Sequence, residues 1–175
     1  MLKKTNSGML EPGPLPSSTN AGLIRTLLLT FILPVCSILI EFTVKKIPVD
    51  PALIGKWFIF WGFGVRLFIA GILQLFRPGL TAVRIYNLRN AKSFAIIKEL
   101  GVVNISLGAM GIFSLFNSEG RPIAAISGCI FFGLATIGHF FRKPDTGNGI
   151  MSLVTDLLLF SVILLYLFFT LFFNQ

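Results

Sequence analysis

The last long apolar stretch of the chain covers residues 150–173 and reads IMSLVTDLLLFSVILLYLFFTLFF. Its only charged side chain is Asp156. An α-helix of about 20 predominantly apolar residues is long enough to cross a bilayer. No water is present there to pair the backbone N–H and C=O groups, so a crossing segment must pair them internally. The stretch therefore predicts a transmembrane helix.

Four more stretches of this 175-residue chain meet the same criterion, and they cover residues 23–42, 53–76, 94–116 and 122–141. Proline, glycine and charged residues lie between the stretches and mark the turns. The stretches at 94–116 and 122–141 are rich in glycine, so the alternative is four spans plus a buried re-entrant segment. We predict an all-α integral membrane bundle of about five transmembrane helices.

The composition excludes an ordinary soluble domain. Hydrophobic residues make up 54% of the chain and charged residues 13%, against roughly 25% charged residues in typical soluble proteins. A soluble protein built this way would expose large apolar patches and aggregate. The net charge of +8 does not indicate a nucleic-acid partner, because the basic residues lie mostly between the apolar stretches. Loops beside an anionic lipid surface have this pattern, so the predicted partner is the bilayer.

The distribution of lysine and arginine predicts the orientation. Cytoplasmic loops carry an excess of these residues. With five spans, one side of the membrane holds Lys3, Lys4, Arg25, Arg77, Arg84, Arg89, Lys92, Arg142 and Lys143. The other side holds Lys45, Lys46, Lys56 and Arg121. We therefore expect a cytoplasmic N-terminus and an outside C-terminus, with residues 1–20 as a flexible cytoplasmic tail and residues 21–175 as the transmembrane domain.

Several polar side chains fall inside the predicted spans, where a central charge costs about 2.5–3.5 kcal/mol on insertion scales. Counted at 1.5 Å of rise per residue, they all fall in the cytoplasmic half of the membrane. Polar groups at one depth on separate helices indicate a shared intramembrane site. The candidate ligand-binding residues are Arg66, Gln74, Glu99, Asn104, His139 and Asp156.

A structural role is the alternative for these residues. Arg66 paired with Glu99 or Asp156 would hold the bundle together and fix the helix register. His139 is the only histidine of the chain, and a lone histidine does not indicate a zinc or haem site, so we predict no metal. Since no nucleotide-binding or hydrolase motif is present, the residues leave the cofactor unknown and do not decide whether the protein is an enzyme.

Short motifs carry a family resemblance. The strings from Gly71 to Pro78, from Glu99 to Asn104, at Gly138-His139 and from Gly147 to Asp156 resemble an uncharacterised family of small bacterial inner-membrane proteins. The pattern is remotely similar to the DoxX-like proteins, which are four-helix membrane bundles. The resemblance covers residues 52–165 and implies a four-helix core, an extra N-terminal helix outside it, and a bacterial inner membrane. DoxX-like proteins are associated with redox partners, but this chain lacks a cysteine pair or cofactor motif that would transfer that role.

These features together favour a binding or accessory protein for a small amphipathic molecule, such as a lipid or a quinone. Arg66 would contact an anionic or carbonyl group, and Asp156 and Glu99 would balance its charge. His139 and Asn104 would supply hydrogen bonds. Two alternatives remain open: a structural subunit with a membrane-protein partner, and an enzyme that uses buried carboxylates for proton transfer.

Overall fold

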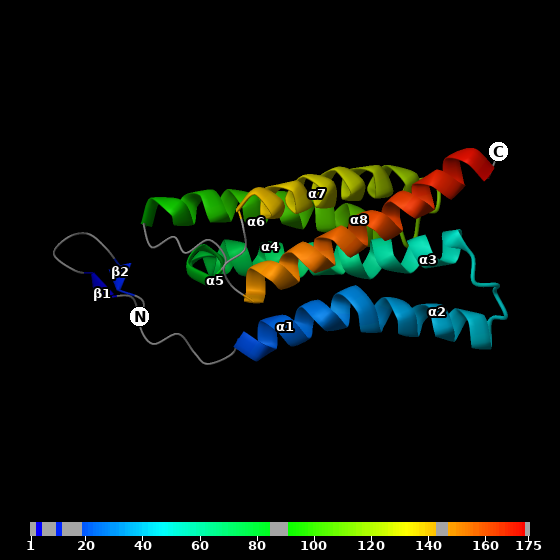
Figure 1. The fold of residues 1–175 in the computed structure, drawn as a ribbon, viewed down its shortest axis with the longest axis horizontal. Helices are drawn as coiled ribbons and strands as arrows, with labels where there is room; N and C mark the ends of the chain where they lie inside the picture. The colour runs from blue at the N-terminus through cyan, green and yellow to red at the C-terminus, as the bar shows by residue number, and fades with distance from the viewer. Residues whose placement is uncertain (1–2, 5–9, 12–18, 85–90, 143–146, 174–175) are drawn as a thin grey trace.

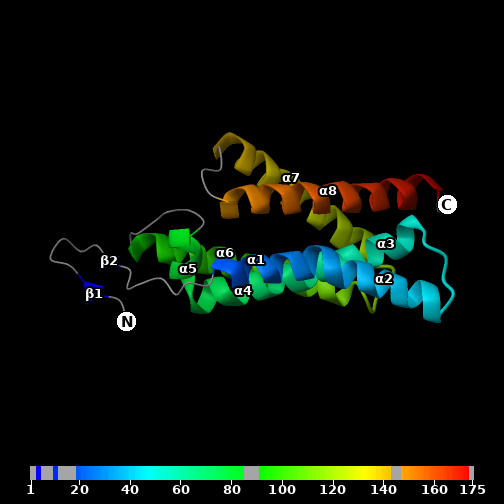
Figure 2. The ribbon, with the colours of Figure 1, turned by 60° about the horizontal axis from the view of Figure 1, so that its bottom comes forward.

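The computed structural model describes residues 3–4, 10–11, 19–84, 91–142 and 147–173. Apart from two strands of two residues each, its regular elements are helices. The strands, β1 (Lys3–Lys4) and β2 (Leu10–Glu11), pair antiparallel within the N-terminal segment. The long helices extend lengthwise along the molecule, with α7 and α8 inclined to the others (Figures 1 and 2). The prediction of an all-α bundle is therefore confirmed.

The first two spans each contain a π-helical turn between two α-helices. The first span consists of α1 (Thr19–Leu27), η1 (Leu28–Ile32) and α2 (Leu33–Val44). The second consists of α3 (Pro51–Phe58), η2 (Ile59–Val65) and α4 (Arg66–Phe76). Three continuous helices follow the short α5 (Pro78–Arg84), and they are α6 (Ala91–Phe113), α7 (Arg121–Arg142) and α8 (Gly147–Phe173).

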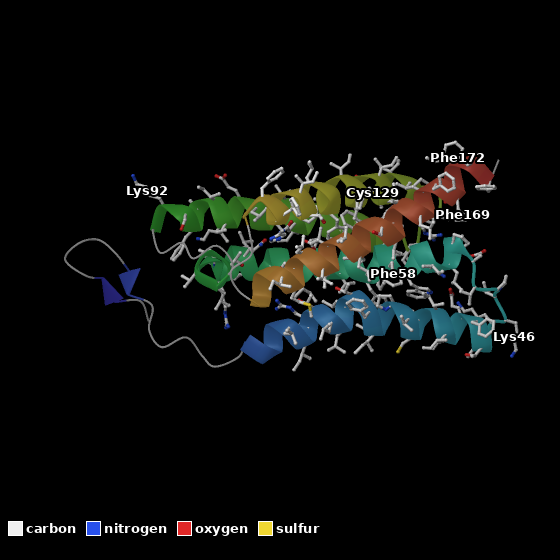
Figure 3. All side chains as sticks on the ribbon, viewed as in Figure 1. Lys46, Phe58, Lys92, Cys129, Phe169 and Phe172 are labelled. Atoms are coloured by element: carbon white, nitrogen blue, oxygen red, sulfur yellow. The ribbon has the colours of Figure 1, made fainter. Side chains whose placement is uncertain are left out.

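Five helices in the described part of the chain are long and apolar enough to cross a membrane. The two glycine-rich segments form the full-length helices α6 and α7, so the alternative with a re-entrant segment is wrong. Successive spans run in opposite directions, which places the starts of α1, α6 and α8 at one end of the bundle (Figures 1 and 2). Lys92 and Lys46 lie at opposite ends (Figure 3).

Glycines bring α4 and α6 into direct backbone contact. A β-carbon added at Gly71 would lie 2.5 Å from the carbonyl oxygen of Gly101. One added at Gly64 would lie 2.7 Å from the backbone nitrogen of Ile112, and one at Gly108 would overlap with the backbone of Phe68. In a membrane, helices associate through such close van der Waals contact, because the lipid supplies no hydrophobic driving force between them.

The second close pair consists of α7 and α8, and aromatic side chains join it to the first. Phe63 of η2 and Phe132 of α7 are fully buried, and their rings meet edge to face at 6.0 Å between centroids. Leu159 and Ile163 of α8 are also fully buried and belong to the same hydrophobic cluster. The core therefore lies where η2 meets α7 and α8.

The first span lies on one side of this four-helix arrangement and packs against α3 (Figure 1). Glu41 of α2 is only 3% exposed, and its carboxylate accepts hydrogen bonds from Lys45, Lys56 and Trp57 at 2.8–3.1 Å. The indole nitrogen of Trp61 donates to the hydroxyl of Ser37 at 3.0 Å. These polar contacts attach the first span to the second at the end of the bundle remote from the N-terminus.

We call the contact that Gly64, Gly71, Gly101 and Gly108 make between the second span and α6 the glycine seam. A substitution in this seam tests the close approach of the helices. Gly108→Ala would place a β-carbon against the backbone of Phe68, and such overpacking typically costs about 1–3 kcal/mol. The matched control is Gly138→Ala on α7, where no described atom lies within 4 Å of the added carbon. Thermal unfolding in mild detergent should give a lower midpoint for Gly108→Ala than for Gly138→Ala. Equal midpoints would contradict this packing.

Candidate functional site

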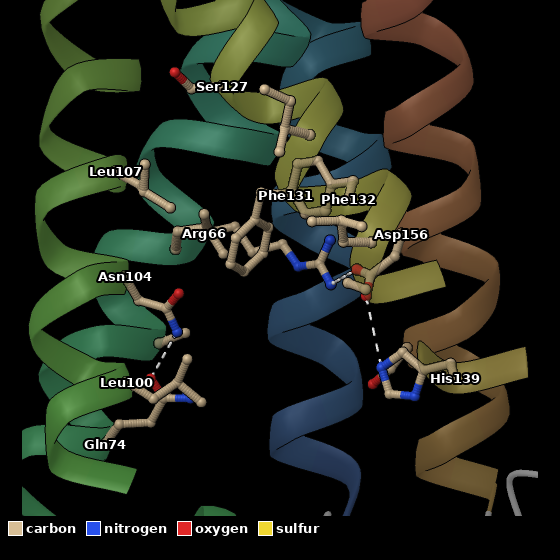
Figure 4. Close-up of a pocket in the computed structure, with 16 residues that line it drawn as sticks. Arg66, Gln74, Leu100, Asn104, Leu107, Ser127, Phe131, Phe132, His139 and Asp156 are labelled. Carbon is tan, nitrogen blue, oxygen red and sulfur yellow. Dashed lines mark hydrogen bonds and ion pairs between the residues drawn. The ribbon is translucent and has the colours of Figure 1, made fainter. Parts of the chain in front are cut away.

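A cavity of about 660 Å³ lies between the pair α4–α6 and the pair α7–α8 (Figure 4). Its size falls within the range of about 300–1,000 Å³ that is usual for small-molecule sites. Most of its wall is apolar, with a few polar groups from all four helices. The lining residues are Arg66, Leu67, Ala70, Gln74, Leu100, Asn104, Leu107, Ser127, Ile130, Phe131, Phe132, Leu134, Ala135, His139, Ser152 and Asp156.

A π-helical turn positions Arg66 at the cavity. In η2 the backbone N–H of Arg66 donates to the carbonyl oxygens of Trp61, five residues earlier, and Phe63, three residues earlier. Gly62 and Gly64 lie within this turn and are buried. Such a turn changes the register of a helix, and π-bulges occur frequently at functional sites. Arg66 is the first residue of α4, directly after the changed register.

Arg66 reaches across the bundle to α8 and forms an ion pair there. Its Nη2 lies 2.7 Å from Oδ1 of Asp156 and 3.2 Å from the hydroxyl oxygen of Thr155. Asp156 is 5% exposed. The guanidinium carbon also lies 5.5 Å from the centre of the Phe132 ring, which is within the range of a cation–π contact. The sequence-based expectation of a pair between Arg66 and one carboxylate is thus confirmed, and the carboxylate is Asp156.

His139 approaches the second oxygen of the same carboxylate. Its Nε2 lies 3.7 Å from Oδ2 of Asp156. This distance is too long for a hydrogen bond, but it allows electrostatic attraction when the imidazole carries a proton. Asp156 therefore lies between the guanidinium of Arg66 on α4 and the imidazole of His139 on α7 (Figure 4).

Gln74 and Asn104 form the opposite side of the cavity. Nδ2 of Asn104 donates to Oε1 of Gln74 at 2.7 Å, and both side chains are buried. The oxygen of Asn104 points away from Gln74, toward the space between the two helix pairs (Figure 4). Five of the six predicted site residues therefore line one cavity.

Glu99 is the exception. Its side chain is exposed, and it is not among the residues that line the cavity. On α6 it lies five residues before Asn104, and at about 100° per residue the two side chains diverge by about 140°. Because α6 is a continuous α-helix over this region, nothing turns Glu99 inward. The expectation that Glu99 helps to balance the charge of Arg66 is therefore wrong.

Sequence reasoning missed two groups that contact Arg66. The Thr155 hydroxyl accepts from Arg66, and it donates to the carbonyl of Met151 at 2.9 Å within its own helix. Its position next to Asp156 was the available signal. No sequence signal identified Phe132, because residue type alone does not distinguish it from the other phenylalanines among the 19 of the chain.

Two polar atoms of cavity-lining residues are buried without a hydrogen-bond partner among the described residues. They are Nη1 of Arg66, which is a donor, and Oδ1 of Asn104, which is an acceptor. A buried polar group left unpaired costs about 1–3 kcal/mol. Native structures satisfy nearly all such groups with protein, water or ligand. Water or a bound molecule would have to supply the partners of these two atoms.

The described residues contain no group of three or more His, Cys, Asp or Glu side chains that could hold a metal ion. The cavity offers one carboxylate and one imidazole toward such a purpose, Asp156 and His139.

Comparison with known proteins gives one finding. A model described as "Family of unknown function (DUF6790)" matches residues 23–174. No curated protein and no solved structure matches the chain. Apart from Gly22 at the start of the first, the match covers the five helices that are long and apolar enough to cross a membrane, and it includes every residue that lines the cavity.

The ion pair across the cavity makes a stability prediction. Arg66→Leu leaves Asp156 charged and without its closest partner, which typically costs about 3–5 kcal/mol for a buried pair. The double variant Arg66→Leu/Asp156→Leu removes both charges and should recover most of that loss. Thermal unfolding midpoints in mild detergent measure both effects, with Lys98→Leu at an exposed position of α6 as control. A double variant less stable than Arg66→Leu would contradict the prediction.

Proposed function

We propose that this chain, which belongs to the DUF6790 family of unknown function, is a membrane protein that binds a small amphipathic molecule within the bilayer. A lipid or a quinone has the required character. The observation that carries the proposal is the cavity of about 660 Å³, in which buried polar atoms of Arg66 and Asn104 lack partners among the described residues.

The arrangement of the wall supports this proposal. Small-molecule sites are mostly apolar, with a few polar groups that fix the orientation of the ligand. Arg66 would contact an oxygen of the ligand, while Asp156 holds the guanidinium in place through its 2.7 Å contact. Asn104 and His139 would add hydrogen bonds. A polar cluster serving only to join helices would be expected to satisfy its own groups, and two atoms here are unsatisfied.

The location of the protein is also part of the proposal. We propose the bacterial inner membrane, with a cytoplasmic N-terminus and the C-terminus outside. The excess of lysine and arginine at the N-terminal end of the bundle supports this orientation. The cavity would then lie in the cytoplasmic leaflet. The remote likeness to DoxX-like bundles stays a proposal and adds no ligand.

Mass spectrometry of gently purified protein tests the binding function. The full-length protein should retain one uniform small molecule after extraction in mild detergent. Arg66→Ala should lose it, because the polar anchor is gone, whereas Lys98→Ala should retain it, because Lys98 is exposed and does not line the cavity.

A second variant tests the same prediction independently, in case Arg66→Ala loses the molecule because it misfolds. Ala135→Phe fills the cavity without removing a charge, since Ala135 lies in its wall, and it should also lose the molecule. Size-exclusion profiles establish that each variant is folded. Wild-type protein that carries nothing, or the same amount of bound compound in all variants, would contradict the proposal.

Cysteine labelling tests the orientation. In a variant with Cys36 and Cys129 replaced by alanine, Ser118→Cys and Lys92→Cys each place one thiol at an exposed position at opposite ends of the bundle. A membrane-impermeant maleimide applied to intact cells should label residue 118 and should label residue 92 only after lysis. The reverse pattern would invert the orientation.

A further inference from the structure

The geometry points to an uncharged ligand: we propose that the cavity selects a neutral head group that carries both a hydrogen-bond donor and an acceptor, attached to a hydrocarbon chain. This inference rests on the proposed binding function and narrows it to one class of molecule. Acylglycerols and prenylated hydroquinones share this chemistry.

The charge balance of the cavity argues for a neutral head group. Among the described residues that line it, Arg66 and Asp156 form an ion pair at 2.7 Å, in which the two charges neutralise each other. An anionic group would have to compete with Asp156 for Arg66 while being repelled by that carboxylate, in a region of low dielectric constant where repulsion is strong. Glu99 and Lys98 are exposed and do not change this balance.

One further cation lies nearby. Arg25 of the first span is close enough to Arg66 for the two charges to repel each other. It is exposed and does not line the cavity. Its charge therefore lies outside the cavity wall and does not form an anion site within the cavity.

The unpaired atoms define the polar contacts that the ligand must make. Nη1 of Arg66 can only donate, so it requires an acceptor such as a carbonyl or hydroxyl oxygen. Oδ1 of Asn104 is an amide oxygen and can only accept, while Nδ2 of the same amide already donates to Gln74. It therefore requires a hydroxyl or N–H donor. A head group with both functions offers a partner to each atom, whereas a simple ester or a hydrocarbon offers none to Asn104.

The rim of the cavity accounts for the hydrocarbon chain. Ile130 and Leu134 of α7 line the cavity although they are 59% and 65% exposed. At membrane depth these exposed apolar side chains face lipid. The cavity is therefore open to the hydrocarbon on the α7 side, and a chain attached to the head group can leave there without crossing a polar barrier.

Equilibrium binding of two matched probes tests the charge argument. 1-Oleoylglycerol and its 3-phosphate share the chain and the glycerol and differ in the phosphate alone. The full-length protein in neutral detergent should bind 1-oleoylglycerol at least tenfold more tightly than the phosphate. Asp156→Asn leaves Arg66 uncompensated and should reverse the preference in favour of the phosphate. A purely structural role for Asp156 would not reverse it.

A third probe tests the hydrogen bonds. Methyl oleate offers an acceptor but no donor and should bind about tenfold more weakly than 1-oleoylglycerol, since one buried acceptor stays unpaired. In Gln74→Leu/Asn104→Leu, which replaces the amide pair with apolar groups, that difference should vanish. Ser106→Ala, at an exposed position of α6, is the control and should preserve it. Decylhydroquinone in the same assay distinguishes the two ligand sources: tighter binding of the hydroquinone assigns a quinol, and weaker binding an acylglycerol.

The outcomes separate this inference from the proposed function. If the wild-type protein prefers the phosphate, the neutral head group is wrong and binding of an amphipathic molecule stands. If an Asn104 variant still distinguishes methyl oleate from 1-oleoylglycerol, the assigned donor contact is wrong. If no probe binds and nothing co-purifies with the protein, both proposals fall.

Discussion

The ion pair between Arg66 and Asp156 is the constraint on which the interior of this bundle depends. It joins α4 to α8 over 2.7 Å within segments that are long and apolar enough to cross a membrane. Neither charge is stable there alone, because each would cost several kcal/mol without a partner. The pair therefore requires η2 to direct Arg66 inward and α8 to present Asp156 at the same depth. The cavity is the space around this bridge.

Two kinds of contact hold the helices of the bundle together. The glycine seam holds α4 and α6 at backbone distance, where no side chain fits between them. The pair α7–α8 is joined to it through large apolar side chains, among them Phe63 and Phe132. Large side chains keep helices farther apart than glycines do. The helices α4 and α6 are therefore in close contact, and the cavity lies between this pair and the pair α7–α8. The polar side chains of the four helices, among them Arg66, Asn104 and Asp156, line this cavity.

Much of the fold and part of the site could be predicted from the sequence. Spans are recognisable because hydropathy is a local sum, and Gln74, Asn104, His139 and Asp156 were found because polar residues are rare in such segments. Helical periodicity already placed Glu99 about 140° from Asn104, and α6 keeps that geometry. The choice of Asp156 as the partner of Arg66 depends on the π-helical register of η2, which no local pattern reveals. The contact of Glu41 with Lys56 could not be predicted from the sequence either, because it depends on how the first two spans pack against each other.

The contact between Glu41 and Lys56 has a consequence for biosynthesis. The second span carries an ammonium group that hydrocarbon disfavours, and the first carries a carboxylate that is 3% exposed once folded. Only the short segment between α2 and α3 separates the two spans in the chain, so they can leave the translocon as a hairpin whose opposite charges are already matched. Lys56 could then enter the membrane already paired with Glu41, and the first span would assist the insertion of the span that carries Arg66.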